Sequence, residues 1–101
     1  LIIEGELNAM ACALARRAND PDLAFMGVAG TGGQLWLEAL KGKDVYCYGD
    51  GDEAGQRARD KWAVAAYDAG ARSVALVDPW EMDASDIFAQ LGPDALRELI
   101  L

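Results

Sequence analysis

The sequence predicts an α/β three-layer sandwich, with a central, mainly parallel four-stranded sheet and helices on both of its faces. Short apolar runs bounded by turn residues alternate along the chain with segments of helical periodicity. The runs are rich in Val, Ile, Leu, Tyr and Cys, which is consistent with strands buried on both faces. Repeated strand–helix–strand units of this kind form a parallel sheet through right-handed crossovers.

In the first half of the chain, strands are expected at residues 1–3 and 23–29. Between them, apolar residues recur at helical spacing: Leu7, Met10, Ala11, Leu14 and Ala18. The Asn-Asp-Pro run at 19–21 should end that helix. A turn, "AGTGG", and a short helix at 34–40 follow the second strand.

In the second half, strands are expected at residues 44–48 and 73–77. The helix between them follows the stretch "GDGDEAG" and carries one apolar stripe: Ala54, Ala58, Trp62, Ala65, Ala66 and Ala69. Gly70 suits the end of this helix. The tail at 83–101 holds two short helices, with Pro93 suited to the first position of the second.

The size and composition predict one soluble globular domain. The chain has 101 residues, of which 52% are apolar and 26% charged. No apolar run approaches the roughly 20 residues that span a bilayer. Because the chain begins at Leu1, without a methionine, we expect it to be a fragment of a larger protein.

The charge and the thiols exclude several kinds of site. The net charge of −8 argues against a standalone DNA-binding module, because phosphates would repel it. Cys12 and Cys47 are expected to be buried, reduced thiols rather than a disulfide or a metal pair. Since the chain has no histidine, any metal here must be held by oxygen ligands.

Carboxylates follow two of the expected strands. Glu4 comes after the first strand, and Asp50 and Asp52 come after the third, within "YGDGDEAGQRAR". Ligands bind beyond the carboxyl ends of parallel strands, so these side chains would meet if the two strands are neighbours. Three such carboxylates would raise each other's pKa unless a cation lay between them, and Mg²⁺ prefers oxygen ligands. The simpler alternative is that Asp52 only caps the helix that begins near Glu53.

The motifs "IIEGELNA" and "YGDGDEAG", about 40 residues apart, resemble those of the Toprim domain. This family is shared by bacterial-type primases, topoisomerases of types IA and II, and some nucleases. The resemblance covers essentially the whole chain as a single Toprim domain with a Rossmann-like fold. It implies that Glu4, Asp50 and Asp52 are the catalytic and metal-binding residues, with Mg²⁺ or Mn²⁺ as cofactor.

Further segments resemble primases and phage or mitochondrial primase-helicases. "GDGDEAGQRA" is similar to their D-x-D-x-A-G-x-x-A segment, and "MDASDIFAQLG" to a later acidic segment. The second similarity implies Asp83, and more loosely Asp86, as additional metal ligands. Asn8 stands where primases usually have aspartate; it can offer an oxygen ligand but no charge. Affinity for a second ion would then be reduced.

Phosphate-binding positions are also implied. Gly30 and Thr31 occupy the place of a Gly-Thr turn in primases, although the segment lacks P-loop and dinucleotide-site spacing. Arg57 and Lys61 lie one turn apart on a helix. They form either a solvated face, with a Glu53–Arg57 pair, or a contact to a nucleic acid or a nucleoside triphosphate. The tryptophans are expected to be packing residues.

The resemblance implies a nucleotidyltransferase of DNA primase or primase-helicase type that makes RNA primers in DNA replication. Its partners would be single-stranded DNA template and nucleoside triphosphates, through the full-length protein, with a helicase domain or partner and no membrane. The location would be the cytoplasm of a bacterial or phage-infected cell. We expect little activity from the isolated domain. Two alternatives stay open: a phosphodiester-cleaving Toprim enzyme (an OLD-type nuclease or a topoisomerase part) and a degenerate Toprim scaffold.

Overall fold

Four parallel strands form one sheet at the centre of the fold. The structure is a computed structural model that describes residues 1–16, 24–28 and 35–100. The strands lie in the order β2–β1–β3–β4, and every neighbouring pair is parallel. Their bounds are β1 Ile2–Glu4, β2 Met26–Val28, β3 Asp44–Tyr48 and β4 Ser73–Val77. The first and third strands are therefore neighbours, as the carboxylate pattern required.

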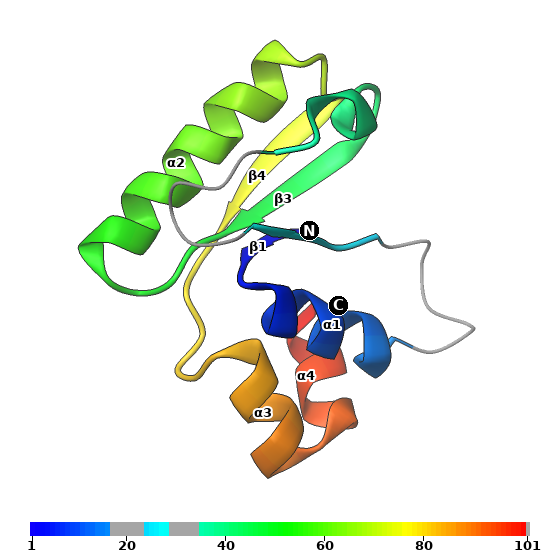
Figure 1. Cartoon of the computed structure of the whole chain (residues 1–101), viewed down its shortest axis with the longest axis vertical. Helices are drawn as coiled ribbons and strands as arrows, with labels where there is room; N and C mark the ends of the chain where they lie inside the picture. The colour runs from blue at the N-terminus through cyan, green and yellow to red at the C-terminus, as the bar shows by residue number, and fades with distance from the viewer. Residues whose placement is uncertain (17–23, 29–34, 101) are drawn as a thin grey trace.

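Helices cover both faces of this sheet (Figure 1). The helical elements are α1 Glu6–Ala15, the 3₁₀ helix η1 Leu37–Leu40, α2 Glu53–Asp68, α3 Ala84–Leu91 and α4 Pro93–Ile100. One hydrophobic cluster joins the sheet to α2 and η1, and a second joins it to α1, α3 and α4. The predicted three-layer α/β sandwich is confirmed.

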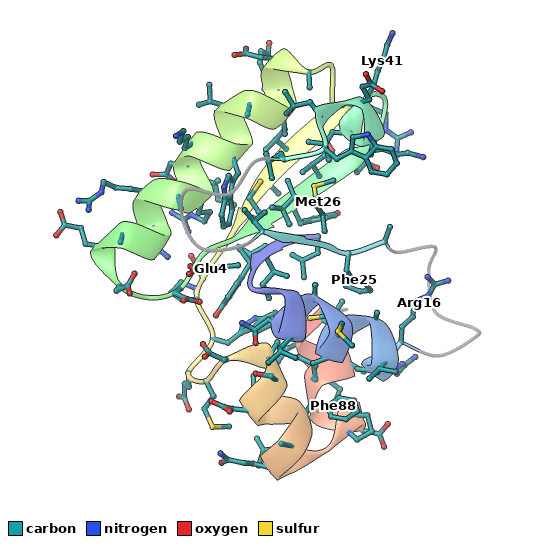
Figure 2. The ribbon with its side chains drawn as sticks, viewed as in Figure 1. Glu4, Arg16, Phe25, Met26, Lys41 and Phe88 are labelled. Atoms are coloured by element: carbon teal, nitrogen blue, oxygen red, sulfur yellow. The ribbon has the colours of Figure 1, made fainter. Side chains whose placement is uncertain are left out.

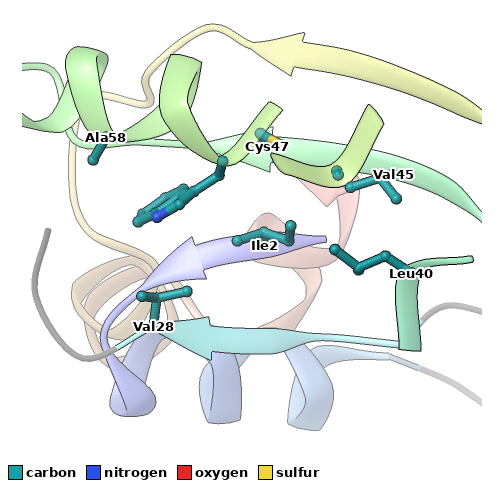
Figure 3. Packing of buried hydrophobic residues seen from close by; sticks show 8 residues of the cluster. Ile2, Val28, Leu40, Val45, Cys47 and Ala58 are labelled. Carbon is teal, nitrogen blue, oxygen red and sulfur yellow. The ribbon is translucent and has the colours of Figure 1, made fainter. Parts of the chain in front are cut away.

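The first cluster fills the space between the sheet and α2 (Figure 3). Successive strand residues point to opposite faces, so Ile2 enters this cluster while Ile3 enters the other. Trp62 is the largest side chain that α2 contributes, and it is 3% exposed. Burying a side chain of this size stabilises the fold by roughly 1.5–3 kcal/mol. The apolar stripe of the predicted helix is thus confirmed at its centre, while Ala54 at its start is exposed.

The face of α1 that packs agrees with the predicted apolar stripe at Ala11 and differs from it at the larger side chains. Leu7, Met10 and Leu14 are 71%, 59% and 68% exposed. Instead, α1 packs in the second cluster through small side chains: Ala11, Cys12 and Ala15. The helix lies between the sheet and the pair α3 and α4 (Figure 1). Small residues let its backbone approach both.

Other elements differ from their predicted bounds by a few residues. Strand β2 is shorter than the predicted 23–29 run, and the helix predicted at 34–40 is the single 3₁₀ turn η1. The Asn-Asp-Pro run at 19–21, which is predicted to end the first helix, lies outside the described residues. Gly70, at φ 93°, ends α2 as expected, and Pro93 is the first residue of α4. Trp36 is 69% exposed, so its expected packing role is wrong.

Both thiols are buried as expected, and the pKa of each is raised to about 11 chiefly by burial. Among the described residues, no helix is both long and apolar enough to cross a membrane.

Candidate metal centre at the carboxyl edge of the sheet

Glu4 and Asp50 meet at the carboxyl ends of two adjacent strands. The register pairs Ile3 with Tyr48, so the next residue of β1, Glu4, lies beside the chain that leaves β3. Figure 2 shows Glu4 at the end of β1, on the side where α2 begins. The carboxyl groups of Glu4 and Asp50 each affect the pKa of the other. The adjacency of β1 and β3 brings the two residues to the same edge of the sheet.

The electrostatics of the pair follow from crowding of acids. Burial raises the pKa of Glu4, and the charge and hydrogen bond of Asp50, then the charges of Asp52 and Asp83, raise it further. Burial likewise raises the pKa of Asp50, together with the charges of Asp83 and Asp52, while the hydrogen bond from Glu4 lowers it. The charges of Asp52 and Asp83 therefore act on Glu4 and Asp50, and this pair holds a proton more readily than isolated acids do.

The loop that carries Asp50 is held against the first turn of α2. Gln56 Nε2 donates to the carbonyl oxygen of Asp50 at 2.9 Å and to that of Gly49 at 3.3 Å. A Cβ on Gly49 would clash with the carbonyl group of Gly55, and one on Gly55 would clash with the backbone of Asp50. Neither glycine has a positive φ. They are needed for the space they leave, which lets the loop lie on the helix.

Asp52 caps α2, as the simpler alternative proposed. Its Oδ1 accepts the Gly55 backbone N–H at 2.6 Å, and it is the N-cap residue of the helix. The side chain is exposed. A carboxylate has further lone pairs, so capping and metal binding are compatible; the ligand role of Asp52 stays a prediction.

A packed connection brings Asp83 towards this edge. The ring of Trp80 stacks on Tyr48 with centroids 4.4 Å apart, and the Trp80 backbone N–H donates to the Tyr48 hydroxyl at 2.9 Å. From the other side, Arg59 Nη1 donates to the carbonyl of Val77 at 3.2 Å. These contacts fix the chain between β4 and α3. Asp83, the N-cap residue of α3, ends this connection.

Asn8 lies next to Glu4, and both ends of its side-chain amide form hydrogen bonds with backbone groups. Nδ2 donates to the Glu4 carbonyl, and Oδ1 accepts the N–H of Ser85, each at 3.0 Å. Asp86 is exposed in the first turn of α3. As ligands, both residues stay predictions.

The donor set suits a hard divalent cation. Within residues 1–16, 24–28 and 35–100, no three acidic or thiol side chains are arranged so that they could hold one ion together. The charges of Asp52 and Asp83 nevertheless act on Glu4 and Asp50 at this edge of the sheet. All are oxygen donors, and Asp52 and Asp83 are exposed, so their side chains can turn towards a shared ion. Repulsion among them is what a cation would relieve.

The predicted phosphate-binding residues have separate outcomes. Arg57 and Glu53 form the expected i,i+4 pair at 2.7 Å, with both side chains exposed. Lys61 is exposed one turn further along α2. Contacts of either cation with a nucleotide or nucleic acid stay predictions. Gly30 and Thr31 lie outside the described residues.

Four residues that shape this site carried no functional prediction: Tyr48, Gln56, Arg59 and Trp80. Gln56 has a local signal, because it follows the N-cap of α2 by four residues and faces back to the loop. The contacts of Arg59 and of the two aromatic residues join positions 18 and 32 apart. Only the packed fold reveals such pairs.

Comparison with known protein families gives one match. The sequence model of a family described as Toprim-like matches residues 1–88. None of the curated proteins and none of the solved structures compared with the chain matches it. The matched segment runs from β1 into α3 and contains every acidic residue of the candidate site.

Proposed function

Because the chain belongs to the Toprim-like family, we propose that it is the catalytic domain of a Mg²⁺-dependent nucleotidyltransferase of DNA primase or primase-helicase type. The observation that carries the proposal is the meeting of Glu4 and Asp50 at adjacent strand ends, with the charges of Asp52 and Asp83 acting on them. The primase type rests on the similarity of "GDGDEAGQRA" to primase segments.

Each acidic residue has a distinct role in this proposal. Asp50 and Asp52 would hold Mg²⁺ or Mn²⁺, with Asp83 at an outer position. The bound ion supplies charge stabilisation to the phosphoryl group in transfer. A Glu4 carboxylate oxygen would accept the proton of the primer 3′-hydroxyl, since its raised pKa makes it a better base than an isolated carboxylate. Glu4 as a further ligand is the other role that its position permits.

The full-length protein would supply what the domain lacks. Single-stranded DNA would be the template and nucleoside triphosphates the substrates, with a helicase as an attached domain or a partner. The test incubates the full-length protein with a single-stranded template, nucleoside triphosphates and Mg²⁺. Short RNA products that disappear with Asp50→Asn support the proposal. Metal-dependent nicking of plasmid DNA without primer synthesis would replace it with the phosphodiester-cleaving alternative.

A non-catalytic interaction module is the second candidate. It is favoured by Asn8 and Asp52, whose side-chain oxygens already accept backbone N–H groups. Titration of the chain with Mn²⁺ separates the candidates. For the catalytic domain, Asp50→Asn should weaken binding tenfold or more, about 1.4 kcal/mol. Asp68→Asn removes the same charge at the far end of α2 and should leave binding unchanged. No Mn²⁺ binding by the wild-type chain would favour the interaction module.

A further inference from the structure

The two ends of the Asn8 amide join two parts of the candidate site. Nδ2 donates to the carbonyl oxygen of Glu4, the last residue of β1, and Oδ1 accepts the backbone N–H of Ser85, 77 positions away. The orientation of the amide is set by its partners, because a carbonyl only accepts and a backbone N–H only donates. Asn8 thereby connects the start of α3 to the end of β1.

Ser85 is the second residue of α3, and its N–H is one that the N-cap side chain ordinarily accepts. The N-cap residue here is Asp83, whose side chain makes no capping hydrogen bond. The other N-cap aspartate behaves in the ordinary way, since Asp52 accepts the N–H of Gly55. The two helices with aspartate at the N-cap, α2 and α3, are thus capped differently, and of these two only α3 is capped by a residue from another helix.

We propose that Asn8 is a positioning residue: it caps α3 in place of Asp83 and so leaves the Asp83 carboxylate available to the metal centre with Glu4 and Asp50. The inference rests on the proposed function, because it concerns the same centre. The charge of Asp83 already acts on Glu4 and Asp50. Without Asn8, the Asp83 carboxylate would turn to the unpaired N–H of Ser85, one of the two N–H groups that an N-cap side chain can accept; Asp52 accepts the other of the two at α2, that of Gly55.

A double-mutant cycle tests this role through Mn²⁺ affinity. The proteins are wild type, Asn8→Ala, Asp83→Ala and the double variant, each first checked for folding by circular dichroism. Each single change should weaken Mn²⁺ binding about three- to tenfold. This loss of affinity is at or below the range seen when residues that orient metal ligands are mutated. The double variant should bind no more weakly than the weaker single variant, because Asn8 acts through Asp83. Wild-type affinity in Asn8→Ala, or losses that multiply in the double variant, would overturn the inference.

Hydrogen exchange of the Ser85 amide gives a readout that needs no metal. The amide should stay protected in each single variant, because either Asn8 or Asp83 can cap it, and should lose protection in the double variant. Exposure of this amide by Asp83→Ala alone would overturn the inference.

A second substitution covers the case in which Asn8→Ala does not fold. Asn8→Asp keeps an acceptor for Ser85 but cannot donate to Glu4. Ser85 should therefore stay protected when Asp83→Ala is added to it, and an unprotected amide would contradict the capping role. Wild-type protein that binds no Mn²⁺ contradicts the proposed function instead, so the two failures are distinguishable.

Discussion

Gly49 and Gly55 lie in direct backbone contact, where the chain leaving β3 crosses the first turn of α2. A Cβ on Gly49 would clash with the Gly55 carbonyl group and lie 2.9 Å from the Cβ of Arg59. A Cβ on Gly55 would lie 2.7 Å from the backbone nitrogen of Asp50. This contact places Asp50 beside Glu4, so the glycines of "GDGDEAG" serve the site through packing.

Alanine at either contact glycine should destabilise the fold and weaken the metal centre. Gly49→Ala and Gly55→Ala force two backbone segments apart, and a clash of this kind costs roughly 2–4 kcal/mol. Gly51→Ala is the matched control, because its new methyl group would meet Pro79 at an ordinary 3.6 Å. Urea unfolding should show a lower free energy of unfolding for Gly49→Ala and Gly55→Ala, and no such decrease for Gly51→Ala. A Gly51→Ala variant as unstable as Gly49→Ala would contradict the packing explanation.

Removal of Arg59 should cost more stability than removal of Arg57. The Arg59 side chain is 14% exposed and donates to the carbonyl of Val77, at the end of β4. Arg59→Ala leaves that carbonyl unpaired and removes packing, which costs about 1–3 kcal/mol. Arg57→Ala breaks only an exposed pair with Glu53, worth about 0.3–0.5 kcal/mol. Thermal unfolding of both variants measures the difference. Equal losses of stability would show that the hydrogen bond from Arg59 to the Val77 carbonyl does not stabilise the fold.

The metal-free chain should become more stable at neutral pH when Asp50 is changed to Asn. The pKa values of Glu4 and Asp50 are higher in the folded state than in the unfolded state, where they lie near 4. The free energy of unfolding therefore falls as pH rises from about 4 to the folded-state pKa of each acid, and the loss persists at higher pH. Solvent screening keeps the gain small, roughly 2–4 °C in Tm at pH 7. Below about pH 3, the gain should vanish. Glu38→Gln, an exposed control on η1, should show no such pH-dependent gain.

Addition of Mg²⁺ or Mn²⁺ should raise the Tm of the wild-type chain, and more at pH 8 than at pH 5. A ligand at 100 times its Kd stabilises the folded state by about 2.7 kcal/mol. Protons compete for Glu4 and Asp50 at the lower pH, because their pKa values are raised. Calorimetry in matched ionic strength with NaCl measures the effect. An equal shift with NaCl would mean general screening and no specific site.

The thiols of Cys12 and Cys47 should not react in the folded chain. Both are fully buried, and burial raises the pKa of each to about 11, so the thiolate is scarce at pH 8. A chromogenic disulfide reagent should release no product from native protein and two equivalents after denaturation in urea. Rapid reaction of one thiol in native protein would show that its cluster opens.

The Asn and Gln side chains of the site illustrate what local sequence cannot reveal. Gln56 acts over a few residues, and its place in the first turns of a helix is readable from the chain. Asn8 acts over 77 positions, and nothing near it in sequence indicates Ser85. The large residues of the α1 stripe were misjudged for the same reason, since Leu7 and Met10 are exposed while the smaller Ala11 and Cys12 pack beside α3.

The sequence by itself determined the α/β class, the four strands and the acids at their ends. Buried strands, helical periodicity and turn residues are local properties, and strand ends show where ligands can bind. The tertiary structure decided which side chains meet: Glu4 with Asp50 by the adjacency of β1 and β3, and Tyr48 with Trp80 by the course of the chain after β4. It also decided that Asn8 caps the helix that begins at Asp83. Such contacts depend on the packing of distant elements, which no local pattern encodes.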